Sequence, residues 1–544
     1  GKWPAYLPDS LPSVADIGIG SPCGIEFGTR SHFPERWRRA LFIADWAYGR
    51  ILAVHLQPRG ASYTGTTEPF LSGRPLNVTD LTFGSDGAMY VTTGGRGTRS
   101  GLYRVSFVGP PAAGETEGDA TAAGLRALRK KLEALQTGPR QDSVSTLWPH
   151  LGHADRFIRH AARVALECQP FEQWQEKAFA ESETDVRLNA LLALSRVAPG
   201  QVQPRLFARL QELPLATFPD EQKLLVTRIY ALSCMRMGRP PADLAATIAR
   251  ELDGIYPAGS RSLNHELCRL LIYLGSPRVV AKTTGLLASS RTAADLLHYL
   301  FHLRIVREGW TLEQRRIAFA ALQRAERQQG ARDYLGALRL VRKELTEALA
   351  PEEREALAGE LAPTAPAFTR VAFDLSKYQF RKAWTLQDFA PEELAVQGSA
   401  ARGREAFAAA QCVQCHRAAN EPGGSFGPDL TGVAARFGRR ELLEHILDPA
   451  KVIDDKFRNV IITLKDATIY AGAVEHEDES QLVLSTASGT DETIEIAKAN
   501  IAERAVSPES PMPAGLLNML DKAQIFDLLA YLESGGAAPA GAHP

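Results

Sequence analysis

The densest group of reactive side chains in the sequence is the run Cys412-Val413-Gln414-Cys415-His416. Thiols three residues apart lie about one helical turn from each other, so both can add to the two vinyl groups on one edge of a porphyrin. The next residue then lies under the iron, where the neutral imidazole of His416 would be the proximal ligand. The spacing therefore predicts one covalently attached haem c.

Two other chemistries use closely spaced cysteines. A thioredoxin-like redox pair normally lies beside a βαβ pattern, which this region lacks. A structural zinc site needs a second Cys or His pair at suitable spacing, and none follows. The other cysteines, Cys23, Cys168, Cys234 and Cys268, are scattered, and we expect free thiols. A Cys234–Cys268 disulfide stays an alternative, since sequence does not give their separation.

Two downstream loops supply further candidate residues for such a haem. In Gly427-Pro428-Asp429-Leu430 the carbonyl of Pro428 would accept the ring N–H of His416, although Gly-Pro also makes a simple turn. The Pro-flanked loop 510–515 holds Met512 outside helical structure, which makes it the predicted sixth ligand. Met519 is the competing candidate, although its neighbours are typical of a packed face. A His/Met pair is typical of electron transfer.

The elements that must position these residues form a last unit over residues 398–536. It begins with a predicted helix over 402–410 and ends with one over 521–532. Between them lies a β insertion, at about 459–505. Its alternating segments predict strands at 460–464, 468–472, 482–485 and 492–496. Residues 362–397 are predicted to form a linker or bridge, with aromatic anchors at Phe373, Tyr378, Phe380 and Trp384.

Two different regions precede this unit. Residues 1–110 read as β structure in which 41–44 recurs as 89–92 and 51–54 as 102–105, a period of about 50 residues that is typical of propeller blades. About two blades cannot close a propeller, which needs about four to eight. Residues 120–361 show helical periodicity, and the echo of 155–162 in 185–191 predicts a HEAT-like α-solenoid. An irregular all-α domain is the alternative. The predicted fold class is therefore multidomain α+β.

Composition excludes several classes of protein. The 544 residues carry a formal net charge of -1, which argues against a nucleic-acid-binding protein, and 45% are hydrophobic, which argues against disorder. No stretch approaches the ~18–20 apolar residues of a transmembrane segment. The start, Gly1-Lys2-Trp3-Pro4, has neither Met nor a signal-peptide pattern. We expect an exported protein without its signal, or a truncated chain.

Other polar groups offer weaker candidates. His150, His153 and His160 lie within one short stretch, and His150 and His153 could ligate a metal at a loop. No carboxylate or Cys joins them at fixed spacing, so helix-cap or partly buried roles are favoured. The acidic run 475–479 is interpreted as a solvated hairpin tip. The turn 94–97 with Arg99 could bind an anion, although such turns are commonly plain loops.

Residues 402–536 resemble the haem-binding domain that is frequent in Planctomycetes and Verrucomicrobia. The resemblance covers the whole C-terminal unit and is carried by the Cys-Val-Gln-Cys-His run and by the runs at 427–431, 436–437, 441–444, 446–451, 512–516 and 527–532. In that family the domain commonly follows a propeller that resembles soluble sugar dehydrogenases and a HEAT-like segment. The resemblance implies the same order of regions here.

Residues 20–108 are similar to the final blades of that propeller. In the quinone-dependent sugar dehydrogenases an Arg-x-Arg-Asp stretch holds the anionic quinone. The corresponding residues here are Asn77-Val78-Thr79-Asp80. Both arginines are missing, so binding of pyrroloquinoline quinone is not carried over from the resemblance.

The leading hypothesis is an exported c-type cytochrome with one His/Met-ligated haem, located in the periplasm or otherwise outside the cytoplasmic membrane. It would transfer electrons to or from a redox partner protein or a dehydrogenase. We expect neither a nucleic-acid partner nor a transmembrane segment. The alternatives are the electron-accepting part of a propeller-type sugar or alcohol dehydrogenase, and a protein-binding scaffold with a haem domain. No catalytic residue is predicted, and electron transfer is favoured over a complete oxidoreductase.

Overall fold

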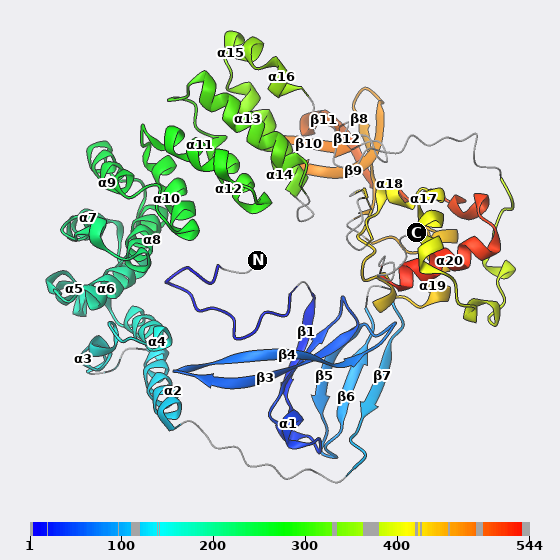
Figure 1. Cartoon of the computed structure of the whole chain (residues 1–544), viewed down its shortest axis with the longest axis horizontal. Coiled ribbons are helices and arrows are strands. Elements are labelled where there is room, and N and C mark those ends of the chain that lie inside the picture. Colours follow the sequence, from blue (N-terminus) through cyan, green and yellow to red (C-terminus); the bar gives the residue numbers. More distant parts are fainter. Residues whose placement is uncertain are drawn as a thin grey trace. The chain divides into compact units, whose positions relative to one another are not determined.

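A computed structural model of the chain describes residues 4–18, 20–95, 97–109, 120–138, 140, 142–328, 334–362, 380–418, 423–424, 427–454, 457–485 and 493–535. The chain forms two compact units (Figure 1). The helical unit combines residues 1–16, 57–65 and 116–367, and the mixed unit combines residues 17–56, 66–115 and 368–544. Helices and sheets are both present, as the predicted fold class requires. The anchors Phe373 and Tyr378 lie outside the described residues.

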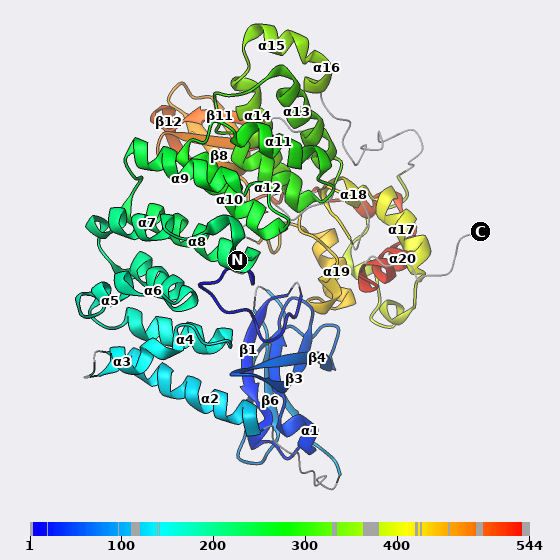
Figure 2. The ribbon, with the colours of Figure 1, turned by 60° about the vertical axis from the view of Figure 1, so that its left-hand side comes forward.

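The helical unit is a succession of helices around one continuous apolar core. Helix α4 packs on α6, α6 on α8, α8 on α10 and α10 on α12 (Figure 2). None of the described helices combines the length and the apolar character that crossing a membrane requires. The helices are α2 (Ala120–Glu133), α3 (Ser143–Leu147), α4 (Arg156–Glu167), α5 (Gln175–Ala180), α6 (Thr184–Val197), α7 (Gln203–Gln211), α8 (Asp220–Met237), α9 (Ala242–Gly254), α10 (Arg261–Leu274), α11 (Val279–Ser289), α12 (Ala293–Leu303), α13 (Leu312–Glu326), α14 (Tyr334–Glu347), α15 (Pro351–Ala356) and α16 (Ala358–Leu361).

The two echoed segments of this unit start their helices differently. The Asp155 side chain caps α4, where it accepts from the backbone N–H of Phe157 at 2.8 Å and of Ile158 at 3.3 Å. Its second oxygen accepts from Ala61 N at 2.8 Å. In the echo, Asp185 lies inside the first turn of α6, and Glu183 is the capping residue. The HEAT-like interpretation of the repeat stays a prediction.

Replacement of Asp155 tests the dual role of this cap. Asp155→Ala removes three backbone hydrogen bonds, so we expect the free energy of unfolding of the helical unit to fall by about 1–2 kcal/mol. Asp155→Asn keeps an oxygen for the cap and should recover most of the loss. Urea denaturation of both variants measures the difference. Equal stabilities for Asp155→Ala and the unsubstituted chain would contradict the assignment.

The N-terminal part of the mixed unit contains two antiparallel sheets. The sheets have the strand orders β1-β2-β3-β4 and β5-β6-β7, and their facing sides share a core that includes Phe42, Phe83 and Met89. The sequence repeat coincides with equivalent pairs, since β2 pairs with β3 and β6 with β7. Their interpretation as propeller blades stays a prediction. The strands are β1 (Pro22–Phe27), β2 (Leu41–Asp45), β3 (Arg50–Arg59), β4 (Ser62–Ser72), β5 (Val78–Phe83), β6 (Met89–Thr93) and β7 (Gly101–Val105), with the short helix α1 (Glu35–Arg38).

The C-terminal part of the mixed unit is built on two helices that cross closely. Helix α17 (Ala400–Ala409) packs on α20 (Lys522–Glu533). A Cβ at Gly403 would lie 2.0 Å from the carbonyl oxygen of Asp527, so only glycine allows this approach. The buried Asp527 carboxylate accepts from Arg402 Nε at 2.7 Å and from Ser399 N at 2.6 Å. These bonds fix the start of α17 against α20.

Between those helices lie α18 (Cys412–Cys415), α19 (Arg439–Leu447) and a five-stranded antiparallel sheet of order β11-β10-β9-β8-β12. Four strands fall in the expected segments, namely β8 (Val460–Leu464), β9 (Ile469–Glu477), β10 (Gln481–Ser485) and β11 (Thr493–Ala497). Strand β9 continues through 475–477, so the hairpin tip expected over 475–479 is confined to residues 478–480. Glu477 is held in the strand by Lys498 at 2.8 Å. The fifth strand, β12 (Ile501–Val506), was not predicted because its residues are mostly exposed and do not alternate.

Candidate functional site

The paired cysteines lie on a single turn that follows α17. Gln411 adopts a left-handed conformation with φ of 61° and reverses the chain into α18. The backbone N–H of His416 donates to the carbonyl of Cys412 at 2.9 Å, which places the two cysteines on one helical turn with the histidine at its end. Cys412 is buried, Cys415 is half-buried, and neither is in a disulfide. Both sulfurs are thus available for a covalent bond.

The His416 ring is oriented by the loop that contains Pro428. The distance from His416 Nδ1 to the Pro428 carbonyl oxygen is 2.8 Å. A carbonyl only accepts, so Nδ1 carries the proton and Nε2 keeps a free lone pair. In this tautomer of the imidazole, Nε2 is able to ligate a metal, and the hydrogen bond to the carbonyl fixes the orientation of the ring.

Glycine at position 427 allows the loop to approach the ring. A Cβ on Gly427 would lie 2.5 Å from His416 Cε1 and 2.6 Å from Nδ1, closer than real contacts. The backbone N–H of Gly427 also donates to the Cys415 carbonyl at 2.7 Å, and Leu430 N donates to Arg417 O at 2.8 Å. In the sequence, Gly427 is recognisable only as part of a turn. The Gly-Pro pair was the available signal, but it did not reveal this close approach.

The surroundings favour uncharged forms of these groups. Burial lowers the pKa of His416, and the Pro428 carbonyl only partly offsets this. Burial also raises the pKa of the Cys412 thiol to about 12. The adjacent core contains Phe407, Val433 and Leu517. An apolar lining, two thiols and a neutral imidazole together match the donor set of a covalently held haem.

Met512 lies on a separate loop that follows the five-stranded sheet. It is half-buried, and its backbone N–H donates to Ser510 Oγ at 3.2 Å. The loop ends at Gly515, whose φ is 81°. The structure thus brings Cys412, Cys415, His416 and Pro428 together, and gives Met512 a place outside that hydrogen-bonded group.

Met519 belongs to a short 3-10 helix, Leu516–Met519, between two residues that are tied to Trp384. The indole N–H of Trp384 donates to Leu520 O at 3.0 Å, and its backbone N–H donates to Asn518 Oδ1 at 3.1 Å. Trp384 therefore anchors the bridge to the C-terminal part, as an aromatic anchor would. Met519 is half-buried between these two anchored residues.

The weaker candidates do not form a second site. His153 Nδ1 accepts from Asp155 N at 2.9 Å, and burial lowers the pKa of His160 to about 4. Among the residues that the structure describes, no three His, Cys, Asp or Glu side chains could hold a metal ion together. Arg99 lies 3.3 Å from Glu441, which already neutralises it. Cys234 and Cys268 are free, which confirms the expectation for both.

Comparison with known proteins identifies one part of the chain. The model of the cytochrome c family matches residues 400–483, a range that contains Cys412, Cys415, His416 and Pro428 but not Met512. No curated protein matches the chain. The match supports a haem-binding, electron-transfer role for this domain and implies haem c as its cofactor. An electron-transfer domain also implies a redox partner.

Gly427→Ala tests whether the ring position depends on this close approach. The added methyl would displace the ring or the Pro428 loop, so we expect the purified variant to contain at least about tenfold less haem per chain. Gly285→Ala is the matched control, since a Cβ at Gly285, on α11, meets no atom within 4 Å. Haem content per chain is measured by absorbance. An unchanged content in Gly427→Ala would contradict the proposed constraint.

Proposed function

We propose that the C-terminal domain is an exported mono-haem c-type cytochrome whose axial ligands are His416 and Met512. The observation that carries the proposal is the His416 ring. The Pro428 carbonyl oxygen, 2.8 Å from Nδ1, holds the ring in its Nδ1–H form beside two cysteines that are not in a disulfide. This geometry lies inside the range that the cytochrome c family model matches. Cytochrome c domains are typically extracytoplasmic, which supports export.

The residues of this chain have distinct roles in that function. Haem c, when bound, supplies an iron that changes its charge by one electron. Cys412 and Cys415 would hold it through thioether bonds, so the group could not dissociate between partners. Pro428 keeps the His416 proton on Nδ1, which leaves Nε2 as the donor to the metal. Because Nδ1–H donates a hydrogen bond to the Pro428 carbonyl, Nε2 is also a more basic ligand.

Met512 is proposed as the sixth ligand for two reasons. Its loop has no regular secondary structure, whereas Met519 lies in a short 3-10 helix whose neighbouring residues are bonded to Trp384. A thioether opposite a histidine saturates the iron and raises its potential, which suits electron transfer and disfavours oxygen binding. The proposed site therefore exchanges electrons without binding substrate.

The alternative of an electron acceptor within a dehydrogenase has one supporting observation. The loops of the two N-terminal sheets contact the C-terminal part of the same unit, where Leu76 N donates to Ala435 O at 2.9 Å and Arg436 lies over the Trp46 ring at 6.0 Å. Asn77, at a position where the quinone enzymes have an arginine, is buried and donates to Gly94 O at 2.9 Å. That residue has a structural role, so the simple cytochrome is preferred.

Methionine replacements test the axial ligand. Met512→Ala should abolish the weak sulfur-to-iron band near the red end of the oxidised spectrum, because no thioether would then ligate the iron. The band should persist in Met519→Ala, which removes the competing thioether. A Met512→Ala variant that retains the band, or a Met519→Ala variant that loses it, would refute Met512 as the ligand.

A further inference from the structure

The N-terminal segment 4–16 belongs to the helical unit although it has neither helix nor strand. Its backbone carbonyls accept hydrogen bonds from arginines of α4. Arg156 donates to Ala5 O at 3.0 Å, to Leu7 O at 2.5 Å and to Ser10 O at 2.6 Å. Arg163 donates to Asp9 O at 3.0 Å. Four of six successive carbonyls are thus bound by guanidinium groups. The backbone turns twice here, since Leu7 N donates to Pro4 O at 3.1 Å and Ser10 N donates to Leu7 O at 3.3 Å.

The Asp9 side chain is the electrostatic anchor of the segment. Its carboxylate is 6% exposed and accepts two hydrogen bonds of 2.9 Å from Arg228, one from Nε and one from Nη2. Arg196 Nη1 lies 3.3 Å away. Arg163, Arg196 and Arg228 come from α4, α6 and α8 in turn, so successive helices each present one arginine to the segment. We call these three residues the arginine row.

Net charge makes the row selective for an anion. Glu167 contacts both Arg163 and Arg196, so it and Asp9 are two carboxylates bound to three guanidinium groups. Burial by itself raises the pKa of Asp9. The hydrogen bonds and positive charge of Arg228 act in the opposite direction and outweigh burial, so the pKa of Asp9 is lowered overall. A bidentate arginine also requires the planar geometry of a carboxylate. A neutral amide at this place would lose the charge-assisted bonds.

Tyr6 and Leu7, which precede Asp9, add apolar contacts between the segment and the helical unit. Leu7 is 3% exposed, although it belongs to a segment that has no core of its own. Tyr6 packs against the apolar core of the helices, and its hydroxyl donates to Glu266 Oε1, on α10, at 3.1 Å. The unit therefore reads an aromatic residue, a leucine and an aspartate at fixed spacing, Tyr-Leu-x-Asp.

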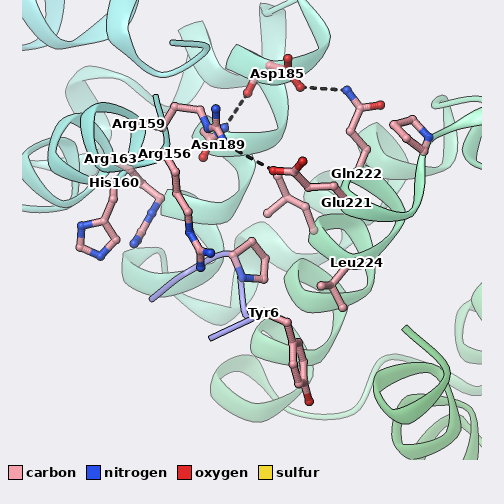
Figure 3. A pocket seen from close by; sticks show the side chains of 13 residues that line it. Tyr6, Arg156, Arg159, His160, Arg163, Asp185, Asn189, Glu221, Gln222 and Leu224 are labelled. Atoms are coloured by element: carbon pink, nitrogen blue, oxygen red, sulfur yellow. Dashed lines mark hydrogen bonds and ion pairs between the residues drawn. The ribbon is translucent and has the colours of Figure 1, made fainter. Parts of the chain in front are cut away.

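The segment does not fill the space that it crosses. A cavity of about 270 Å³ remains beside it, lined by Tyr6, Pro8, Arg156 and Arg159 and by Glu221 on α8 (Figure 3). Figure 3 shows Arg156, Arg159 and Arg163 on the same side of this cavity, with Tyr6 at its other end. A groove with spare volume accommodates segments with bulkier side chains than the residues 4–16.

We propose that the arginine row and its flanking residues form a peptide-docking groove of the helical unit. Its partner is an acidic segment of the Tyr-Leu-x-Asp type on another protein, bound in the turned conformation of residues 4–10, and residues 4–16 occupy the groove as an intramolecular ligand. This inference does not rest on the haem site. It makes the helical unit a recognition module whose own N-terminal segment competes with the partner.

Binding of a synthetic peptide to the full chain tests the proposal. The probe is a fluorescein-labelled peptide with the sequence of residues 4–16, and the measurement is fluorescence anisotropy. Asp9→Asn weakens the intramolecular ligand, so this variant should bind the peptide at least about tenfold more tightly than the unsubstituted chain. Adding Arg228→Gln to Asp9→Asn should remove that binding.

The peptide itself supplies the matched control. A peptide with Asn at the position of Asp9 should bind at least about tenfold more weakly to the Asp9→Asn chain, whereas one with Ala at the exposed position of Ser13 should bind as before. Circular dichroism checks that the variants are folded. If Asp9→Asn does not fold, Leu7→Ala opens the same groove. Equal affinities for the three peptides, or no binding to either opened variant, would overturn the proposal.

Discussion

The hydrogen bond from His416 Nδ1 to the carbonyl of Pro428 is the interaction on which the candidate site depends. It selects one tautomer of the imidazole, directs Nε2 away from the loop and fixes the ring before any group is bound. The contact exists only because Gly427 has no side chain, since a Cβ there would overlap the ring. One carbonyl and one missing methyl group thus determine what the histidine can do.

The rest of the domain keeps this arrangement apolar and rigid. Helices α17 and α20 meet at Gly403, and Arg402 closes the contact by binding the buried Asp527. The turn at Cys412 follows α17 after the reversal at Gln411, so the orientation of the thiols depends on that reversal and on the position of the helix. Burial then disfavours both the charged imidazole and the thiolate. Such surroundings suit a covalently held, uncharged donor set rather than acid–base catalysis.

Much of this organisation could be predicted from local sequence signals. The Cys-Val-Gln-Cys-His spacing indicated the chemistry, and alternation located strand β8 at its observed bounds. Strand β12 could not be found in this way, because an edge strand that is exposed on both faces has no alternation. The close approach of Gly427 to His416 and the capture of Asp9 by Arg228 bring together residues that are separated in sequence, so local periodicity could not reveal them. Spacing identifies reactive residues, whereas packing determines how they are oriented.

A haem bound through two thioethers stays on the chain after denaturation, so the mass of the denatured chain shows whether the attachment is covalent. We expect the chain, purified from a host that matures c-type cytochromes, to be heavier than the polypeptide by one haem, and we expect that acid acetone does not extract the haem. The double variant Cys412→Ser, Cys415→Ser should have the mass of the polypeptide alone. A chain with the mass of the polypeptide alone, or one that releases all its haem into acid acetone, would rule out covalent attachment of haem.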